Sequence, residues 1–153
     1  MSTSTNKASI FTQNEGVVPI NKLWRVGLIA AVGAASFNLV YFWVTKAAFD
    51  IPYIIPMGGP SGALRALPAA VIIIFNVVPA IGATILLAIL GRFLSRPFRV
   101  FWIISVVVFA SSFTLPLSLP SNVANSTKIG LSLMHFPASA LIIGVLTRLG
   151  REK

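Results

Sequence analysis

Residues 26–45 read VGLIAAVGAASFNLVYFWVT, a run of 20 residues that contains no charged side chain. Three later runs, residues 66–91, 100–127 and 129–147, are uncharged in the same way and hold 26, 28 and 19 residues. A helix needs about 20 predominantly apolar residues to cross a hydrocarbon core about 30 Å thick. The pattern predicts an all-α integral membrane four-helix bundle, with helices over residues 24–46, 66–91, 100–115 and 129–149.

The segments outside these helices are marked by proline, glycine and polar residues. We expect the third helix to stop at Pro116, because a proline inside a helix removes a hydrogen bond and clashes with the preceding turn. Residues 50–64, DIPYIIPMGGPSGAL, contain three prolines and three glycines, which exclude a continued helix. Their apolar side chains predict a segment along the membrane interface or folded back over the outer mouth of the bundle. Residues 1–22 are polar and predict a flexible cytoplasmic tail before one transmembrane domain over residues 23–150.

Basic residues lie at the ends of the uncharged runs, and their number alternates from one end to the next. One side of the predicted bundle has Lys46, Arg65 and Lys128. The other side has nine: Lys7, Lys22, Lys153 and the expected anchors Arg25, Arg92, Arg96, Arg99, Arg148 and Arg151. Cytoplasmic loops retain an excess of Lys and Arg. We therefore expect a protein of the bacterial inner membrane. Both termini and the loop between the second and third helices should face the cytoplasm.

Composition separates this chain from soluble proteins. It is 56% hydrophobic and 10% charged, whereas soluble domains have about 45–50% apolar and about 25% charged residues. The net charge of +9 does not indicate a nucleic-acid partner, because the basic residues form no continuous stripe and no aromatic stacking platform accompanies them. We expect their partner to be the anionic headgroups of the cytoplasmic leaflet.

Side chains that carry catalysis or bind metals are scarce. The only acids, Glu15, Asp50 and Glu152, lie outside the uncharged runs, no cysteine is present, and His135 is the only histidine. This argues against a carrier that relays protons through buried carboxylates, against a metal site within one chain and against a nucleophile–base pair. We expect no enzyme, no metal and no cofactor, with a haem on His135 as the weaker alternative.

Polar side chains inside the runs gather in the outer half of the predicted bundle, as judged from a rise of about 1.5 Å per residue. They are Asn38, Asn76, Ser111, Ser112 and His135. Such residues either line a cavity or ligand pocket or hydrogen-bond between helices and fix their register. We favour the second interpretation for Asn and Ser, and both stay open for His135. The expected kinks at Pro79 and Pro137 would free carbonyl groups nearby.

Four stretches carry a family resemblance: LWRVGLIAAVGAASFNLVYF from residue 23, IPYIIP from 51, LLAILGRFLSRPFR from 86 and LSLMHFPASALIIGVLTRLG from 131. The chain resembles a family of small bacterial four-helix membrane proteins catalogued only as a domain of unknown function. The resemblance covers about residues 23–150 and implies the topology without an activity. Asn38 and His135 match polar positions of that pattern.

Three functions stay open at this point. The first is an accessory, scaffold or interaction subunit, in a homo-oligomer or a larger membrane complex, because small residues in the first helix would let helices approach closely. The second is a small oligomeric transporter or channel component. The third is a binder of a lipid or hydrophobic cofactor in an outer-half cavity.

Overall fold

The computed structural model describes residues 16–59 and 62–152. Its elements, in chain order, are α1 (Ile20–Phe49), β1 (Ile54–Pro56), β2 (Leu64–Ala66), α2 (Ala69–Phe93), α3 (Pro97–Ser112), α4 (Thr114–Leu117) and α5 (Asn125–Leu149). Four helical segments are long and apolar enough to cross a membrane, with α3 and α4 counted as one. The predicted four-helix architecture is therefore confirmed.

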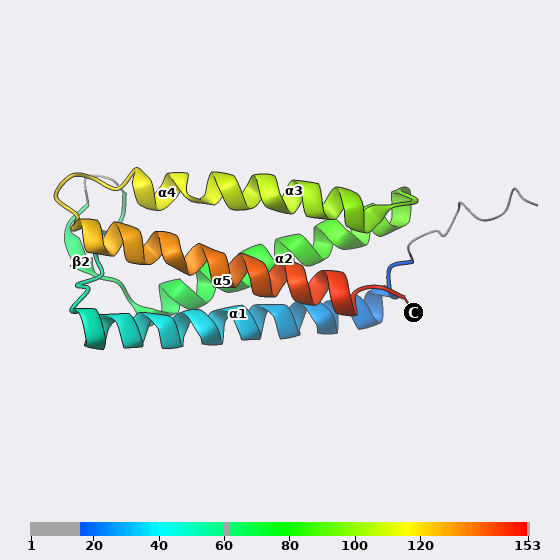
Figure 1. The fold of residues 1–153 in the computed structure, drawn as a ribbon, viewed down its shortest axis with the longest axis horizontal. Coiled ribbons are helices and arrows are strands. Elements are labelled where there is room, and N and C mark those ends of the chain that lie inside the picture. The colour runs from blue at the N-terminus through cyan, green and yellow to red at the C-terminus, as the bar shows by residue number, and fades with distance from the viewer. Residues whose placement is uncertain (1–15, 60–61, 153) are drawn as a thin grey trace, which may run out of the picture.

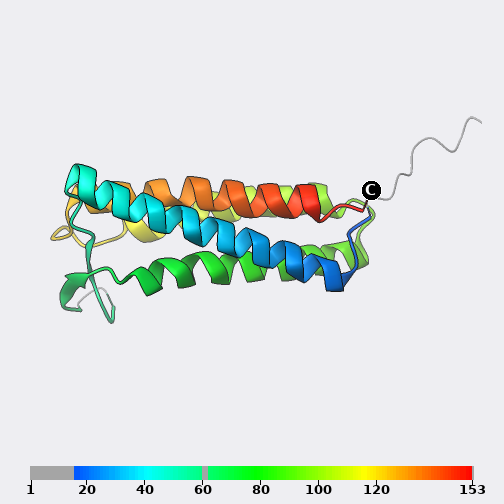
Figure 2. The same cartoon turned by 90° about the horizontal axis from the view of Figure 1, so that it is seen from below.

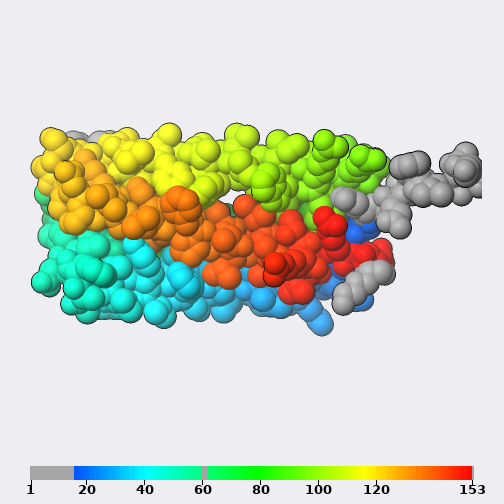
Figure 3. All heavy atoms as spheres, in the orientation of Figure 1, coloured from blue at the N-terminus to red at the C-terminus, as the bar shows by residue number. Residues whose placement is uncertain are grey.

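The four long segments run up and down along a common direction (Figure 1). The β1–β2 hairpin lies at one end of the bundle, and the α2–α3 loop lies at the other end with the C-terminus and the start of α1 (Figures 1 and 2). One face of the molecule is formed by α3 with α4, then α5, then α1 (Figure 3). Helix α1 is the most buried of the four and the α3–α4 segment the least.

Small residues on α1 let the neighbouring helices α2 and α5 approach it closely. Ala30 and Ala34 are fully buried on the face that meets the other helices. Gly27 touches Thr84 of α2 so closely that an added Cβ would collide with the Thr84 hydroxyl. The small-residue face of α1 is thus used inside the bundle, as close helix packing in an apolar surrounding requires.

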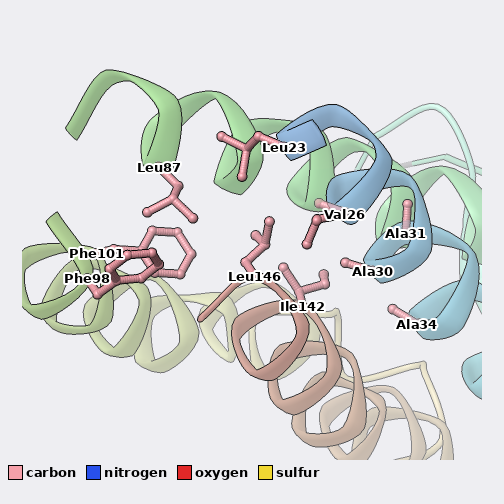
Figure 4. Close-up of a cluster of buried hydrophobic side chains, with 11 residues drawn as sticks. Leu23, Val26, Ala30, Ala31, Ala34, Leu87, Phe98, Phe101, Ile142 and Leu146 are labelled. Atoms are coloured by element: carbon pink, nitrogen blue, oxygen red, sulfur yellow. The ribbon is translucent and has the colours of Figure 1, made fainter. Parts of the chain in front are cut away.

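Large side chains fill the core near the α2–α3 loop. Phe98 and Phe101 of α3 lie beside Leu87 of α2 and Leu146 of α5 (Figure 4). Pro97 is the first residue of α3, where its missing N–H costs little because no intrahelical acceptor faces it. The proline and the two phenylalanines therefore start α3 and attach it to its neighbours.

We expected the third helix to stop at Pro116, and the structure differs from this expectation. The helix breaks earlier, at Phe113, and resumes as the single turn α4 with Pro116 inside it. In the first turn of a helix the proline loses no hydrogen bond. The helical segment therefore reaches Leu117, two residues beyond the expected end.

The segment between α1 and α2 folds back onto the bundle, which was one of the two expected arrangements. Its strands β1 and β2 pair antiparallel, with Ile55 opposite Arg65, and this hairpin was not predicted. Tyr53, just before β1, is 1% exposed although its φ of 44° lies in the left-handed region. Its ring packs against Phe42, and its hydroxyl lies 2.7 Å from Thr45 Oγ1. Tyr53 therefore fastens the hairpin to α1.

Most of the predicted cytoplasmic tail lies outside the described residues. Of its remainder, Gly16–Val18 pairs with the chain beyond α5, through hydrogen bonds from Val18 N to Gly150 O (3.0 Å) and from Glu152 N to Gly16 O (2.9 Å). Helix α1 begins at Ile20, directly after Pro19. The two described chain ends are therefore tied to each other.

Candidate ligand-binding site

A pair of buried asparagines links the helices in the half of the bundle nearer the hairpin. Asn38 of α1 donates one amide N–H to Asn76 Oδ1 of α2 at 3.0 Å and the other to the carbonyl of Met134 in α5 at 3.1 Å. Asn76 in turn donates to the Ile72 carbonyl of its own helix at 2.7 Å. Both asparagines are 3% exposed. Three helices therefore meet at one amide.

A proline follows each of the two residues that accept hydrogen bonds from Asn38, at the same spacing. Pro79 lies three residues after Asn76, and Pro137 lies three residues after Met134, each within a continuous helix. A proline has no N–H to offer and pushes away the carbonyl of the preceding turn. Pro137 therefore leaves the carbonyl of Leu133, the neighbour of Met134, without its usual intrahelical donor. The two expected kink residues lie beside the asparagine pair.

One acceptor of this network has no partner. Both N–H groups of Asn38 face oxygen acceptors, so the orientation of its amide is fixed by its neighbours. Its Oδ1 is buried and accepts no hydrogen bond from any residue that the structure describes. A buried unpaired acceptor costs about 1–3 kcal/mol. Asn38 therefore retains one unused acceptor, and the residue also lines the cavity described below.

His135 offers a second acceptor. Its Nδ1 lies 2.8 Å from the Leu131 carbonyl, which can only accept, so Nδ1 carries the proton. In the neutral ring the other nitrogen, Nε2, is then an acceptor. The imidazole lies beside the Phe113 ring, with 5.6 Å between their centroids.

Asn38, Asn76 and His135 line the same partly open cavity of about 150 Å³. The rest of its lining is apolar: Ile55, Leu67, Val71, Ile72, Phe75, Leu115, Pro116, Leu119, Leu131, Met134 and Ala138. Lys128 secures one rim by donating from Nζ to the Leu119 carbonyl at 2.7 Å. An apolar pocket with a few convergent polar groups is the usual form of a small-molecule site.

The structure does not bring Ser111 and Ser112 to this cavity. Ser111 is exposed and donates to the Val108 carbonyl, and Ser112 donates to the Phe109 carbonyl, both within α3. Each hydroxyl thus closes a local bond on its own helix. Of the five expected polar residues, three line the cavity and these two lie apart from it.

Sequence reasoning did not anticipate the rim of the cavity. Ile55 and Leu67 come from the hairpin segment, Leu115 and Pro116 from α4, and Leu119 from the loop that follows. The signal available was the apolar character of these proline-rich segments, which is unusual for solvated loops.

A family comparison agrees with this architecture. A family model for a family of unknown function matches residues 19–152, which include every helix and every residue of the cavity. The chain belongs to family DUF6069. The expected membership in a family without assigned function is thus confirmed. Comparisons with curated proteins and with solved structures find no match.

Within the DUF6069 match, most charged residues lie away from the cavity, and Lys128 is the one that bonds to its rim. The six expected anchor arginines lie at the bundle end opposite the hairpin, at the ends of α1, α2 and α5 and around the start of α3. Among residues 16–59 and 62–152 no three His, Cys, Asp or Glu side chains gather as a metal site would need. The cavity itself contains no carboxylate.

Proposed function

We propose that this protein is a multi-pass protein of the bacterial cytoplasmic membrane, with both termini in the cytoplasm. Four helices of sufficient length and apolarity support insertion. The hairpin end has Lys46, Arg65 and Lys128. The opposite end has seven described basic residues: Lys22, Arg25, Arg92, Arg96, Arg99, Arg148 and Arg151. The positive-inside rule then assigns the hairpin to the outer surface.

The protein's role in this proposal is to bind a lipid or another hydrophobic molecule with a hydroxyl or N–H group in the cavity beneath the hairpin. The observation that carries the proposal is that Asn38, which lines an apolar cavity, has a buried Oδ1 that accepts no hydrogen bond from any residue that the structure describes. The acceptor supplied by His135 favours the same donor-bearing ligand. An apolar molecule without a donor group would leave Asn38 Oδ1 without a hydrogen bond.

The size of the cavity limits what it holds. A dry cavity of about 150 Å³ is large enough for a benzene-sized ring. The cavity described here has the same volume, about 150 Å³, and is partly open. It therefore accommodates a ring or a short stretch of acyl chain, while the remainder of a larger lipid projects outward. Without a carboxylate beside His135, we propose binding without catalysis.

The scaffold function receives less support. It depended on the small residues of α1, and most of these are packed within one chain, as Gly27 is against Thr84 and Ala30 is in the core cluster. Among the residues that the structure describes, the cavity is confined to the hairpin half of the bundle, which favours a binding site over a transport path.

Native mass spectrometry of the protein purified in mild detergent tests the proposal. We expect wild type to retain one hydrophobic molecule. Ala138→Leu, which fills the cavity, should reduce retention about tenfold, because a filled pocket loses its ligand contacts. Ala140→Leu is the matched control, because Ala140 is exposed on the same helix and does not line the cavity. Equal retention by the two variants, or an empty wild type, would refute the proposal.

A further inference from the structure

A separate groove lies between α3 and α5, at the end of the bundle that has the six anchor arginines. It has a volume of about 690 Å³ and is lined by Phe98, Arg99, Trp102, Ile103, Thr147 and Arg151. Two arginines from different parts of the chain thus border one hollow, with apolar side chains beside them.

We propose that this groove binds one anionic phospholipid, whose phosphate lies between Arg99 and Arg151 and whose acyl chain follows Trp102 and Ile103. Basic pockets between membrane helices on the cytoplasmic side are suited to anionic headgroups. The inference rests on the proposed insertion and orientation, because only then do the two arginines lie at headgroup level.

Packing holds Arg151 in place at the groove. Its guanidinium carbon lies 4.7 Å from the centroid of the Phe98 ring, which is itself 2% exposed in the core (Figure 4). The backbone of Arg151 pairs with Val17. A guanidinium positioned over an aromatic ring and on a paired backbone loses less freedom on binding phosphate than a free side chain does.

The charge around the groove is positive. No acidic residue is part of its lining. Glu152 follows Arg151 directly but lies beside Gly16, where an added Cβ would be 2.9 Å from its Oε2. Arg99 is the third residue of α3, so the unpaired N–H groups and the positive dipole of that helix end add to the attraction for an anion.

The apolar half of the groove fits an acyl chain. Trp102 is 57% exposed and Ile103 is 54% exposed, one turn deeper than Arg99. Tryptophan prefers the level where headgroups meet hydrocarbon. The order of residues along α3 is therefore cation, interfacial ring and aliphatic side chain, which matches the order of parts in a phospholipid.

Lipid retention by charge variants is the first test. The protein is purified from an equal mixture of phosphatidylglycerol and phosphatidylcholine, and native mass spectrometry counts the retained lipids. Arg99→Gln/Arg151→Gln should retain at least about fivefold less phosphatidylglycerol than wild type, because charge-assisted hydrogen bonds to the phosphate are lost. Arg25→Gln/Arg148→Gln removes the same charge from the same bundle end and should behave as wild type. An equal fall in both variants would show diffuse surface attraction and overturn the proposal.

A second pair of variants leaves the charge unchanged. Ile103→Trp should fill the groove and displace the lipid, whereas Val107→Trp, one turn along α3 and 63% exposed, should retain it. Glycerol 3-phosphate, which has no acyl chain, should not displace the lipid at equal concentration. Displacement by it, or equal retention by the two tryptophan variants, would contradict a lipid site. Maleimide labelling of Ser95→Cys and Ser121→Cys tests the orientation of the protein separately from this lipid site.

Discussion

The side chains of Asn38 in α1 and Asn76 in α2 are joined by a 3.0 Å hydrogen bond, with the Asn38 amide as donor. The second N–H of Asn38 reaches the Met134 carbonyl in α5. Both amide nitrogens of the pair therefore donate between or within helices, and the Oδ1 of Asn38 is the one side-chain polar atom of the pair without a described partner. The same residue that links the helices thus also lines the cavity and retains an unused acceptor.

The asparagine pair should be energetically coupled. In a double-mutant cycle with Asn38→Ala and Asn76→Ala, we expect a coupling free energy of about 0.6 kcal/mol, and no more than about 1.7, as for other interhelical hydrogen bonds in membranes. The measurement is reversible unfolding in detergent. Strictly additive effects of the two substitutions would mean that the bond contributes nothing to stability.

Two glycines of α1 should respond oppositely to the same substitution. Gly27→Ala places a methyl group against Thr84 and is expected to lower the free energy of unfolding by about 1–3 kcal/mol through overpacking. Gly33 has open space around it, so Gly33→Ala should be neutral or stabilise the helix by up to about 1 kcal/mol. Thermal unfolding of the two variants in detergent gives the comparison. Similar melting temperatures would show that α1 and α2 are not in close contact at Gly27.

Tyr53 should make stability depend on alkaline pH. Burial raises the pKa of its phenol above the ordinary 10.0, although the hydrogen bond to Thr45 opposes this. The unfolded chain therefore deprotonates first, and the stabilisation is complete below about pH 10 and is lost as pH rises through the folded pKa. Tyr53→Phe removes this part of the pH dependence. Unfolding free energies measured from pH 8 to 11 check it, and identical pH profiles for the two proteins would contradict it.

The orientation is testable because the chain has no natural cysteine. Ser95 lies in the α2–α3 loop and Ser121 in the loop before α5, and both are exposed. A membrane-impermeant maleimide added to intact spheroplasts should label Ser121→Cys, and it should label Ser95→Cys only after the membrane is permeabilised. The reverse pattern would invert the proposed topology.

The arrangement of the helices was largely readable from the sequence, because absence of charge over about 20 residues is a strong constraint in a bilayer. The asparagines and His135 were readable for the same reason, since an apolar run makes each polar residue conspicuous. Depth along a helix, however, says nothing about which face a side chain occupies. Ser111 and Ser112 lie at a similar expected depth but bond within α3, away from the cavity.

The hairpin and the cavity rim could not be read in the same way. The left-handed backbone of Tyr53 is held by burial against Phe42 and by Thr45, and these contacts exist only once α1 has formed. The conformation at Tyr53 thus follows from tertiary packing, which local sequence rules do not contain. Pro116, in contrast, acts locally: α3 ends at Ser112, the residue whose carbonyl Pro116 cannot bond, and the helix resumes at Thr114.

The most direct test of the proposed function is an experimental density map of the protein purified in native-like lipid, inspected at Asn38. The account predicts elongated non-protein density in the cavity, with a donor atom at about 2.7–3.2 Å from Asn38 Oδ1. A cavity that holds only water at Asn38, or one closed by movement of Leu115 and Leu131, would contradict it.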